Sequence, residues 1–287
     1  MTTKTATRRS TEDRKAQAQQ LHDDLTAKIS ELTQGDNWKT WLDFAARFRH
    51  YSFGNMLLIQ AQMPGATHVA GYRAFQAMGR QVRKGEKAIK IFGYSTKKLV
   101  DVDEETGTET VTGKQAFYPV LSVFDISQTD GDEIPAAPAQ PVLLEGDDET
   151  AIYERTAAFL RGRGWDVAVE PITAPGVNGF TSPATREIRV DEALSPAARA
   201  KTGLHEAAHA ILHVDADEPS QHRGIREVEA ESVAYILGAM LGLDTSSYSI
   251  SYVTGWARAD VELIRSTASN VLRAVGTLAD ALLPAGE

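Results

Sequence analysis

The most informative segment of the chain is KTGLHEAAHAILH, residues 201–213, which contains the pattern H-E-A-A-H. The residues of this segment are typical of an α-helix. Because residues four apart on a helix share one face, the imidazoles of His205 and His209 can bind one ion. Glu206 then flanks the open side of that ion, where a water would be bound. Zinc lowers the pKa of such a water, and a neighbouring carboxylate can take the proton. The segment therefore predicts a hydrolytic metal centre with Glu206 as its base.

A catalytic zinc usually takes a third protein ligand, and the segment REVEAESVAYIL, residues 226–237, offers three glutamates. Helical periodicity places Glu229 in the apolar stripe of this segment, and Glu227 and Glu231 outside it. A carboxylate in an apolar stripe is costly unless it is paired or binds a metal. We therefore expect Glu229 to be the third ligand, with Glu231 as the next candidate. A buried salt bridge at the start of the helix is the alternative role of Glu229.

Two residues beyond the motif are further candidates. Asp215 stands six residues after His209, where metalloproteases of the HExxHxxGxxH/D type place their third ligand, but the turn-forming glycine of those motifs is here Leu212. His213 continues the i+4 row one turn further, so we interpret it as a residue that supports a ligand or as a surface histidine. The alternative for the whole motif is a pair of polar histidines on a partly buried helix, with Glu206 solvated.

Composition limits the possible classes of protein. The 287 residues are 42% apolar and 24% charged, as in ordinary globular proteins. The chain has no cysteine, which excludes disulfides, thiol nucleophiles and Cys-ligated zinc, and is consistent with a reducing compartment. The N-terminal segment lacks the apolar core of a signal peptide, and the longest apolar stretch, 233–243, is too short to span a membrane. We therefore expect a cytoplasmic protein without membrane partners.

Charge divides the chain into two unlike halves. Residues 1–100 carry 17 lysines and arginines against 8 aspartates and glutamates, whereas residues 101–287 carry 13 against 31. Cationic clusters attract phosphate and an acidic surface repels it, so polyanion binding is expected only in the first half. Solvated surface charge without any partner is the alternative.

The periodicity of the chain predicts an α+β fold with two domains. Residues 131–147 combine acidic residues and prolines, as linkers do, and separate a first domain, 11–130, from a second domain, 148–287. In the first domain we expect helices near 12–32, 38–62 and 70–79, and strands at 88–94 and 117–126 on either side of a hairpin tip at 103–108. In the second we expect helices near 149–160, from 196 onward, at 226–243 and at 257–283, with strands at 165–170 and 187–190.

Cations and aromatic residues alternate in two segments of the basic half, 47–55 and 72–90. Cations can follow a phosphate backbone while exposed rings stack on unpaired bases, which suits single-stranded nucleic acid with little sequence preference. The alternative is that the rings belong to the core and the cations face solvent. The candidate nucleic-acid-binding residues are Arg47, Arg49, Tyr51, Asn55, Tyr72, Arg73, Phe75, Arg80, Arg83, Lys84, Lys87 and Lys90.

Taken together, the two halves resemble the ArdC family of antirestriction proteins. The N-terminal resemblance spans about residues 15–130 and rests on four segments: YSFGN (51–55), GYR (71–73), GRQVRKGEK (79–87) and VFDISQT (123–129). The C-terminal resemblance spans about residues 148–285. It is to zincin-type metallopeptidases related to the ImmA/IrrE group, through HEAAH (205–209) and EVEA (227–230).

This resemblance implies a first domain that binds single-stranded DNA and a second domain that is a zincin-type metallopeptidase. Zinc is the expected metal, and manganese is the alternative. The implied ligands are His205, His209 and Glu229, and the implied general base is Glu206. The family's role is to protect mobile-element DNA that enters a bacterial cell. Two other functions stay open: a DNA-coating protein whose metal site is idle, and a regulatory peptidase that cleaves a repressor. A restriction or repressor protein is the expected protein substrate.

Overall fold

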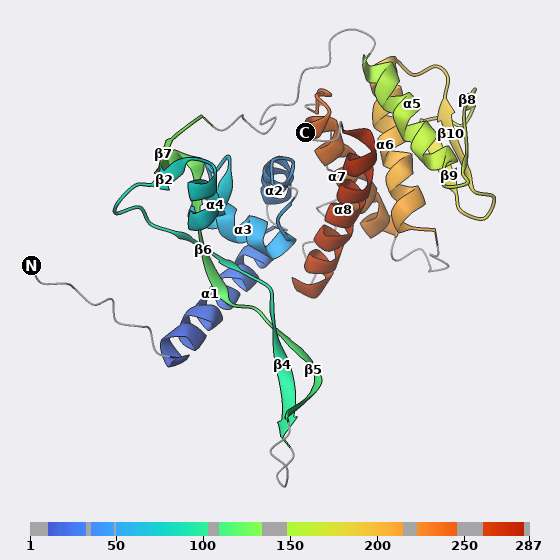
Figure 1. Ribbon diagram of the computed structural model, residues 1–287. Coiled ribbons are helices and arrows are strands. Elements are labelled where there is room, and N and C mark those ends of the chain that lie inside the picture. The colour runs from blue at the N-terminus through green and yellow to red at the C-terminus, as the bar shows by residue number, and fades with distance from the viewer. Residues whose placement is uncertain are drawn as a thin grey trace, which may run out of the picture. The chain divides into compact units, whose positions relative to one another are not determined.

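The computed structural model describes residues 11–32, 36–48, 50–102, 109–133, 148–214, 223–245 and 261–283 (Figure 1). Helices and strands mix in both parts of the chain, which confirms the expected α+β fold. Two compact units form, one from Met1–Lys28 with Leu57–Ile134 and one from Ile29–Met56 with Pro135–Glu287. None of the helices in the described ranges combines the length and the hydrophobicity that crossing a membrane requires.

Small antiparallel sheets build the first unit. Strands β1 (Val69–Gly71), β6 (Val120–Asp125) and β3 (Ile89–Phe92) form one sheet in the order β1-β6-β3. Strand β2 (Arg80–Val82) pairs with β7 (Thr129–Gly131), and β4 (Ser95–Val102) pairs with β5 (Glu109–Phe117). The expected strands at 88–94 and 117–126 are confirmed, and the β4–β5 hairpin connects them and projects from the unit (Figure 1). The expected hairpin tip, 103–108, lies outside the described residues.

Helices α1 (Thr11–Glu31), α3 (Phe53–Gln62) and α4 (Tyr72–Ala77) supply further core residues. The spacing of Leu21 and Leu25 on α1 predicted a buried face, and both side chains are buried. In the same unit, Leu58 of α3 and Phe75 of α4 are also buried. The core of this unit therefore consists mainly of helix and sheet side chains that apolar periodicity identifies.

The predicted helix at 38–62 is two helices, α2 (Asn37–Ala45) and α3, separated by residues 46–52. Ser52 begins the second one: its Oγ accepts a hydrogen bond from the backbone N of Asn55 at 3.4 Å, and its carbonyl accepts one from Met56 at 2.9 Å. A serine in this position satisfies a backbone donor that has no partner in the first turn. The continuous apolar pattern concealed this start signal.

The second unit places one mixed sheet against helices. Strand β10 (Glu187–Asp191) lies between β8 (Asp166–Glu170), to which it is parallel, and β9 (Gly179–Ser182), to which it is antiparallel. Helices α5 (Asp148–Arg161) and α6 (Pro196–Leu212) contact this sheet, α7 (Arg223–Met240) packs on α6, and α8 (Val261–Leu282) packs on α7 (Figure 1). These are the helices that the sequence predicted; residues 257–260 of the last one lie outside the described ranges.

Helix α2 packs in the second unit, although the sequence grouped it with the first domain. The indole Nε1 of Trp38 donates a hydrogen bond to Ser232 Oγ of α7 at 2.9 Å, and the hydroxyl of Tyr235 donates one to Asp43. Trp38 and Ser232 are both buried. The partner of an amphipathic helix depends on tertiary packing, so the linear position of α2 in the chain did not reveal it.

The carboxylate of Asp125, in the segment Val123–Thr129, links the end of β6 to neighbouring backbone in the first unit. Its Oδ2 accepts hydrogen bonds from the backbone N of Thr67 at 2.7 Å and of His68 at 3.0 Å, and its Oδ1 accepts one from Ser127 at 3.0 Å. The side chain of Gln128 in turn accepts from the backbone N of Asp125, which completes a capping box. Asp125 is 1% exposed, so these bonds hold the end of β6 to the chain before β1.

Candidate metal centre

Helix α6 begins where the sequence predicted. Ser195 Oγ accepts a hydrogen bond from the backbone N of Ala198 at 3.3 Å, and Pro196 occupies the first turn, where it has no amide hydrogen to satisfy. Gly203 lies in the buried part of the helix, and a Cβ at that position would come within 2.9 Å of the ring of Tyr153 on α5. Close packing against α5 therefore fixes the rotation of α6 about its own axis, and with it the direction of its histidines.

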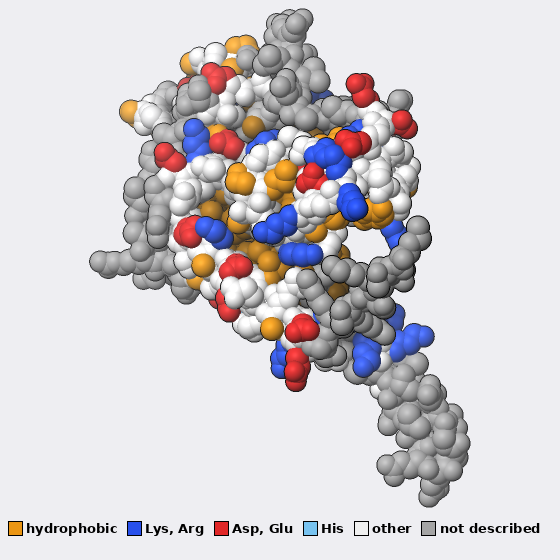
Figure 2. Space-filling view, turned by 90° about the vertical axis from the view of Figure 1, so that its left-hand side faces the viewer, with side chains coloured by type: hydrophobic (Ala, Val, Ile, Leu, Met, Phe, Trp, Pro, Cys, Tyr) orange, Lys and Arg blue, Asp and Glu red, His pale blue; other side chains and the backbone are white. Residues whose placement is uncertain are grey.

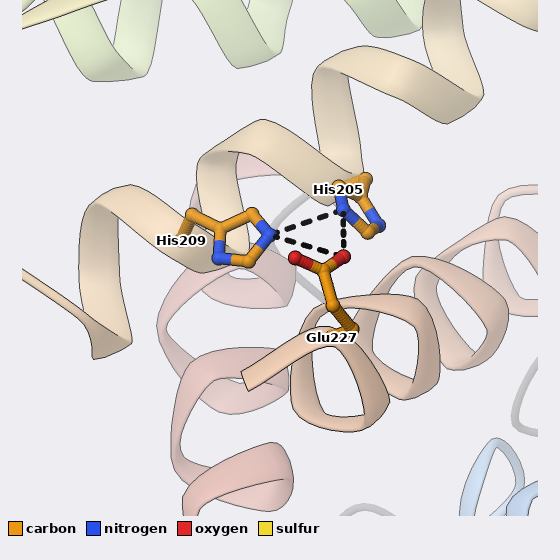
Figure 3. A group of neighbouring side chains, drawn as sticks. All are labelled: His205, His209 and Glu227. Carbon is orange, nitrogen blue, oxygen red and sulfur yellow. Dashed lines mark hydrogen bonds and ion pairs between the residues drawn. The ribbon is translucent and has the colours of Figure 1, made fainter. Parts of the chain in front are cut away.

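The imidazoles of His205 and His209 converge with the carboxylate of Glu227 from α7 (Figure 3). The Nε2 atoms of the two histidines are 3.1 Å apart. Glu227 Oε2 lies 3.5 Å from Nε2 of His205 and 3.8 Å from Nε2 of His209. Two residues one helical turn apart thus meet a third from a neighbouring helix.

These distances fit a four-coordinate cation. Ligand atoms that lie about 2.1 Å from a tetrahedral ion are about 3.4 Å from one another, close to the separations among these three side chains. The donor set of two imidazole nitrogens and one carboxylate oxygen is one that catalytic zinc sites use, with the fourth position left open. The three side chains are partly buried, with 16 to 33% of their side-chain surface exposed, so a small molecule can reach them.

Glu229, the expected third ligand, does not lie in this group. Its Oε2 is 2.8 Å from Nε2 of His213, and its Oε1 accepts a hydrogen bond from the side-chain amide of Asn270 at 2.8 Å. Periodicity correctly indicated that Glu229 is buried, since it is 4% exposed. It could not show which side of α7 faces the histidines, because that depends on how α6 and α7 cross.

Glu231, the second candidate, lies beside the pair rather than among its metal-facing atoms. Its Oε2 is 3.3 Å from Nδ1 of His205, the ring nitrogen that points away from His209. The Nζ of Lys201 lies 3.9 Å from the other carboxylate oxygen of Glu231. The three glutamates of α7 therefore occupy three different environments around the two histidines.

Opposite charges determine the protonation of the metal-free centre. Burial lowers the pKa of His205, but its hydrogen bonds with Glu227 and Glu231 outweigh burial and raise the pKa from 6.5 to about 9. The hydrogen bond from His205 holds the pKa of Glu227 well below its ordinary value. His205 is therefore cationic at neutral pH until a metal binds, and binding releases its proton.

Glu206, the predicted base, is buried between α6 and the edge strand β9. Its Oε2 accepts a hydrogen bond from the hydroxyl of Thr181 at 2.7 Å. Gly179 allows this approach, because a Cβ there would come within 2.7 Å of Thr202 Cγ2 and 2.9 Å of the carbonyl oxygen of Arg189. Sequence reasoning missed Thr181, since nothing in its own segment connects it to α6.

The two residues beyond the motif differ in their outcome. Nδ1 of His213 lies 2.8 Å from Nδ1 of His209, so His213 is a buried neighbour of the pair and not a surface histidine. Asp215 lies outside the described residues.

The structure divides the candidate nucleic-acid-binding residues. Phe75 is fully buried in the core beside His68, so its ring cannot stack on a base and that expectation is wrong. Arg80 donates to Thr129 and to the carbonyls of Gly131 and Asp132, which ties β2 to β7. Two more cations have partners: Arg83 pairs with Glu86 and Asp130, and Lys90 donates to Ser122. Tyr51 and Asn55 are partly buried, and Arg49 lies outside the described residues. The remaining candidates are exposed: Arg47, Tyr72, Arg73, Lys84 and Lys87.

Sequence reasoning missed an aromatic pair at the base of the β4–β5 hairpin. Tyr94 is 69% and Tyr118 is 62% exposed, and their rings meet edge to face at 5.9 Å. Exposed lysines follow on the two strands: Lys97, Lys98 and Lys114. Figure 2, which views the molecule from the left-hand side of Figure 1, shows basic side chains interleaved with hydrophobic ones. The signal in the sequence was the pair of tyrosines at the start and end of the hairpin.

The fold and the site define a two-domain protein whose second domain has a metallopeptidase-like fold. Residues 15–124 match the model of the N-terminal domain of anti-restriction factor ArdC, and residues 161–251 match that of the IrrE N-terminal-like domain, a peptidase family. The chain therefore combines an ArdC-type N-terminal domain with a peptidase-like domain of the IrrE N-terminal-like type.

Solved structures share the fold. The metal-free crystal structure of the antirestriction protein ArdC from plasmid R388 has a TM-score of 0.53 and 24% identity, over 81% of this chain and 85% of that one. The Mn(II)-bound structure of the same protein has a TM-score of 0.57 and 19% identity, over 93% of this chain and 99% of that one. An uncharacterized protein of Bacillus anthracis is 27% identical over 249 residues, 75% of this chain. This chain spans 42% of the length of that curated relative.

Proposed function

We propose that this protein is a metal-dependent peptidase that also binds single-stranded DNA and protects incoming mobile-element DNA from restriction. The observation that carries the peptidase part is the convergence of His205, His209 and Glu227 at spacings that suit a tetrahedral ion. The buried carboxylate of Glu206 follows His205 directly on the same helix. Zinc is the metal that this ligand set favours, and manganese, present in a crystal structure of the R388 protein, is the ion to compare.

Each side chain has a chemical task in amide hydrolysis. A divalent cation held by the two imidazoles and Glu227 supplies Lewis acidity, which polarises the scissile carbonyl and lowers the pKa of water. Glu206 accepts the proton of the attacking water and returns it to the leaving amine. The hydroxyl of Thr181 donates to Oε2 of Glu206, which orients the carboxylate and leaves Oε1 to accept the proton.

Replacing Glu206 with glutamine tests the peptidase proposal. The amide keeps the shape of the side chain and can still accept the hydrogen bond from Thr181, but it cannot take a proton from water. We expect peptidase activity to fall by about 10² to 10⁴-fold while metal content stays unchanged. The measurements are proteolysis of candidate restriction and repressor proteins, with and without single-stranded DNA, and protection of incoming DNA in cells that carry a restriction system.

The exposed Glu192, in the same unit, provides the matched control Glu192→Gln, which is expected to behave as the wild type. If Glu206→Gln protects DNA as well as the wild type does, the protein acts by coating DNA, and hydrolysis at the metal centre does not contribute to protection.

The DNA-binding part of the proposal rests on the exposed surface of the first unit. Tyr94 and Tyr118 present two rings to solvent, and lysines lie on the adjoining strands at positions 97, 98 and 114. Rings stack on unpaired bases of any sequence, and lysines neutralise the phosphates between them. Of the segment 72–90, the exposed Arg73, Lys84 and Lys87 are the residues that we assign to the same function.

The triple variant Lys97→Gln, Lys98→Gln, Lys114→Gln tests this surface. Affinity for single-stranded DNA is expected to fall steeply with salt in the wild type, and the variant is expected to lose about two units of the logarithmic salt slope, since each contact with a single strand contributes about 0.7. Fluorescence anisotropy of a labelled oligonucleotide at several salt concentrations measures both quantities. Arg155→Gln on the exposed side of α5 is the control. Binding that does not change with salt contradicts the proposal.

A further inference from the structure

His209 is the first member of a chain of close contacts that runs through three helices. Its Nδ1 lies 2.8 Å from Nδ1 of His213, at the end of α6. Nε2 of His213 lies 2.8 Å from Oε2 of Glu229 on α7. Oε1 of Glu229 accepts a hydrogen bond from the side-chain amide of Asn270 on α8, also at 2.8 Å. His213 and Glu229 are both less than 10% exposed, so water does not replace these partners.

Only one placement of hydrogens lets His209 bind a cation and satisfies every contact in this chain. A metal-binding His209 needs a lone pair on Nε2, the nitrogen that faces Glu227. The ring hydrogen of His209 is then on Nδ1 and is donated to His213. Nδ1 of His213 is then an acceptor, so the hydrogen of His213 is on Nε2 and is donated to Glu229. Glu229 accepts at both oxygens, which is what an ionised carboxylate does.

We propose that His213 and Glu229 are positioning residues, which hold His209 in the tautomer and ring orientation that binds the metal. This inference rests on the proposed metal centre at His205, His209 and Glu227. A carboxylate that reaches a metal-binding histidine through a hydrogen bond fixes its tautomer and makes the ligand nitrogen more basic. Here the carboxylate acts through a second imidazole, and Asn270 fixes its direction.

The burial of Glu229 supports this assignment. A buried carboxylate is costly unless charged or polar partners compensate it. In the described residues around Glu229 the partners are one imidazole and one amide, with no lysine or arginine within ion-pairing distance. A buried negative charge near the centre is compensated further when a divalent cation binds on the other side of His209.

His205 has its own carboxylate, which provides an internal comparison. Glu231 lies 3.3 Å from Nδ1 of His205, but 26% of its side-chain surface is exposed, against 6% for Glu229. Its contact is longer and solvent competes with it, so it orients its histidine less strongly. Glu231→Gln is therefore the matched control for Glu229→Gln, on the same helix and with the same change of charge.

Zinc titration of the metal-free protein against a chromophoric chelator tests the proposal without reference to activity. We expect Glu229→Gln and His213→Leu to bind zinc about 10 to 100-fold more weakly than the wild type, and Glu231→Gln to lose less. His213→Asn keeps an acceptor near the position of Nδ1, so it is expected to restore part of the affinity that His213→Leu loses. Wild-type affinity in Glu229→Gln and His213→Leu overturns the proposal while the metal centre itself stands.

Imidazole ¹⁵N NMR of the metal-free wild-type protein gives a second readout that needs no folded variant. The hydrogen of His209 is expected on Nδ1 and that of His213 on Nε2. A spectrum with the hydrogen of His209 on Nε2 overturns the positioning role. If the wild type binds no metal at all, the proposed peptidase centre fails, and the positioning role fails with it. If the wild type binds zinc and the variants bind it equally well, only the positioning role fails.

Discussion

Replacing both His205 and His209 with alanine is expected to reduce the bound metal from about one ion per chain to none. The two imidazoles are two of the three proposed protein ligands, and a lone carboxylate at Glu227 does not hold a transition metal at micromolar concentration. In the wild type, a metal concentration a thousand times its Kd stabilises the fold by about 4 kcal/mol. The double variant is expected to show no such stabilisation when metal is added.

Elemental analysis of the purified protein measures the metal content, and thermal unfolding with and without zinc measures the stabilisation. The control is the double variant His22→Ala, His50→Ala, because both of these side chains are exposed and lie far along the chain from the H-E-A-A-H motif. Full metal occupancy in the His205→Ala, His209→Ala protein would show that the ion binds elsewhere.

The third ligand can be identified in the same experiment. Glu227→Ala removes a side chain whose oxygen lies 3.5 and 3.8 Å from the two metal-facing nitrogens, so it is expected to weaken binding more than Glu229→Ala does. The opposite order of affinities would make Glu229 the ligand, as the periodicity of α7 predicted, and would require that α7 rotates when metal binds.

Replacing Asp125 with alanine is expected to destabilise the first unit by about 3–5 kcal/mol. The backbone N–H groups of Thr67, His68 and Ser127 all donate to this buried carboxylate, and alanine leaves them without their acceptor in a partly buried site. Asp125→Asn keeps one acceptor oxygen and is expected to lose about half as much. The exposed Asp130, 3.3 Å from Arg83, provides the control Asp130→Ala, with a change below about 1 kcal/mol.

Chemical denaturation followed by far-UV circular dichroism measures this loss, and amide hydrogen exchange in β1 and β6 locates it. Tryptophan fluorescence reports separately on the second unit, to which Trp38, Trp41 and Trp165 belong. A loss of stability confined to the tryptophan signal would contradict the role of Asp125 in the first unit.

The same contribution depends on pH in a defined direction. Burial raises the pKa of Asp125, but the hydrogen bonds from Ser127, Thr67 and His68 outweigh it, so the pKa lies below the ordinary value of 3.8. A carboxyl group with a lowered pKa in the folded state contributes stability that is present above its unfolded pKa and is lost as pH falls through the folded value. The stabilities of the wild type and Asp125→Ala are therefore expected to converge in acid.

Much of the architecture could be predicted because it depends on local patterns. The helix cap at Ser195 and Pro196, the buried leucines of α1 and the existence of strands β3 and β6 follow from residues close together in the chain. The break between α2 and α3 was missed because the apolar pattern continues across Ser52. The exposure of Tyr94 and Tyr118 was missed because a hairpin strand shows alternation, but not which of its faces a core covers.

The sequence by itself determined the H-E-A-A-H pair, the helix that carries it and the α+β character of both parts, since helix geometry alone places residues four apart on one face. Only the tertiary structure decided that Glu227 faces the two histidines, that Glu229 lies behind them on His213, and that α2 packs on α7. Each of these depends on the angle and rotation at which two helices meet, which is set by side-chain packing between segments distant in sequence.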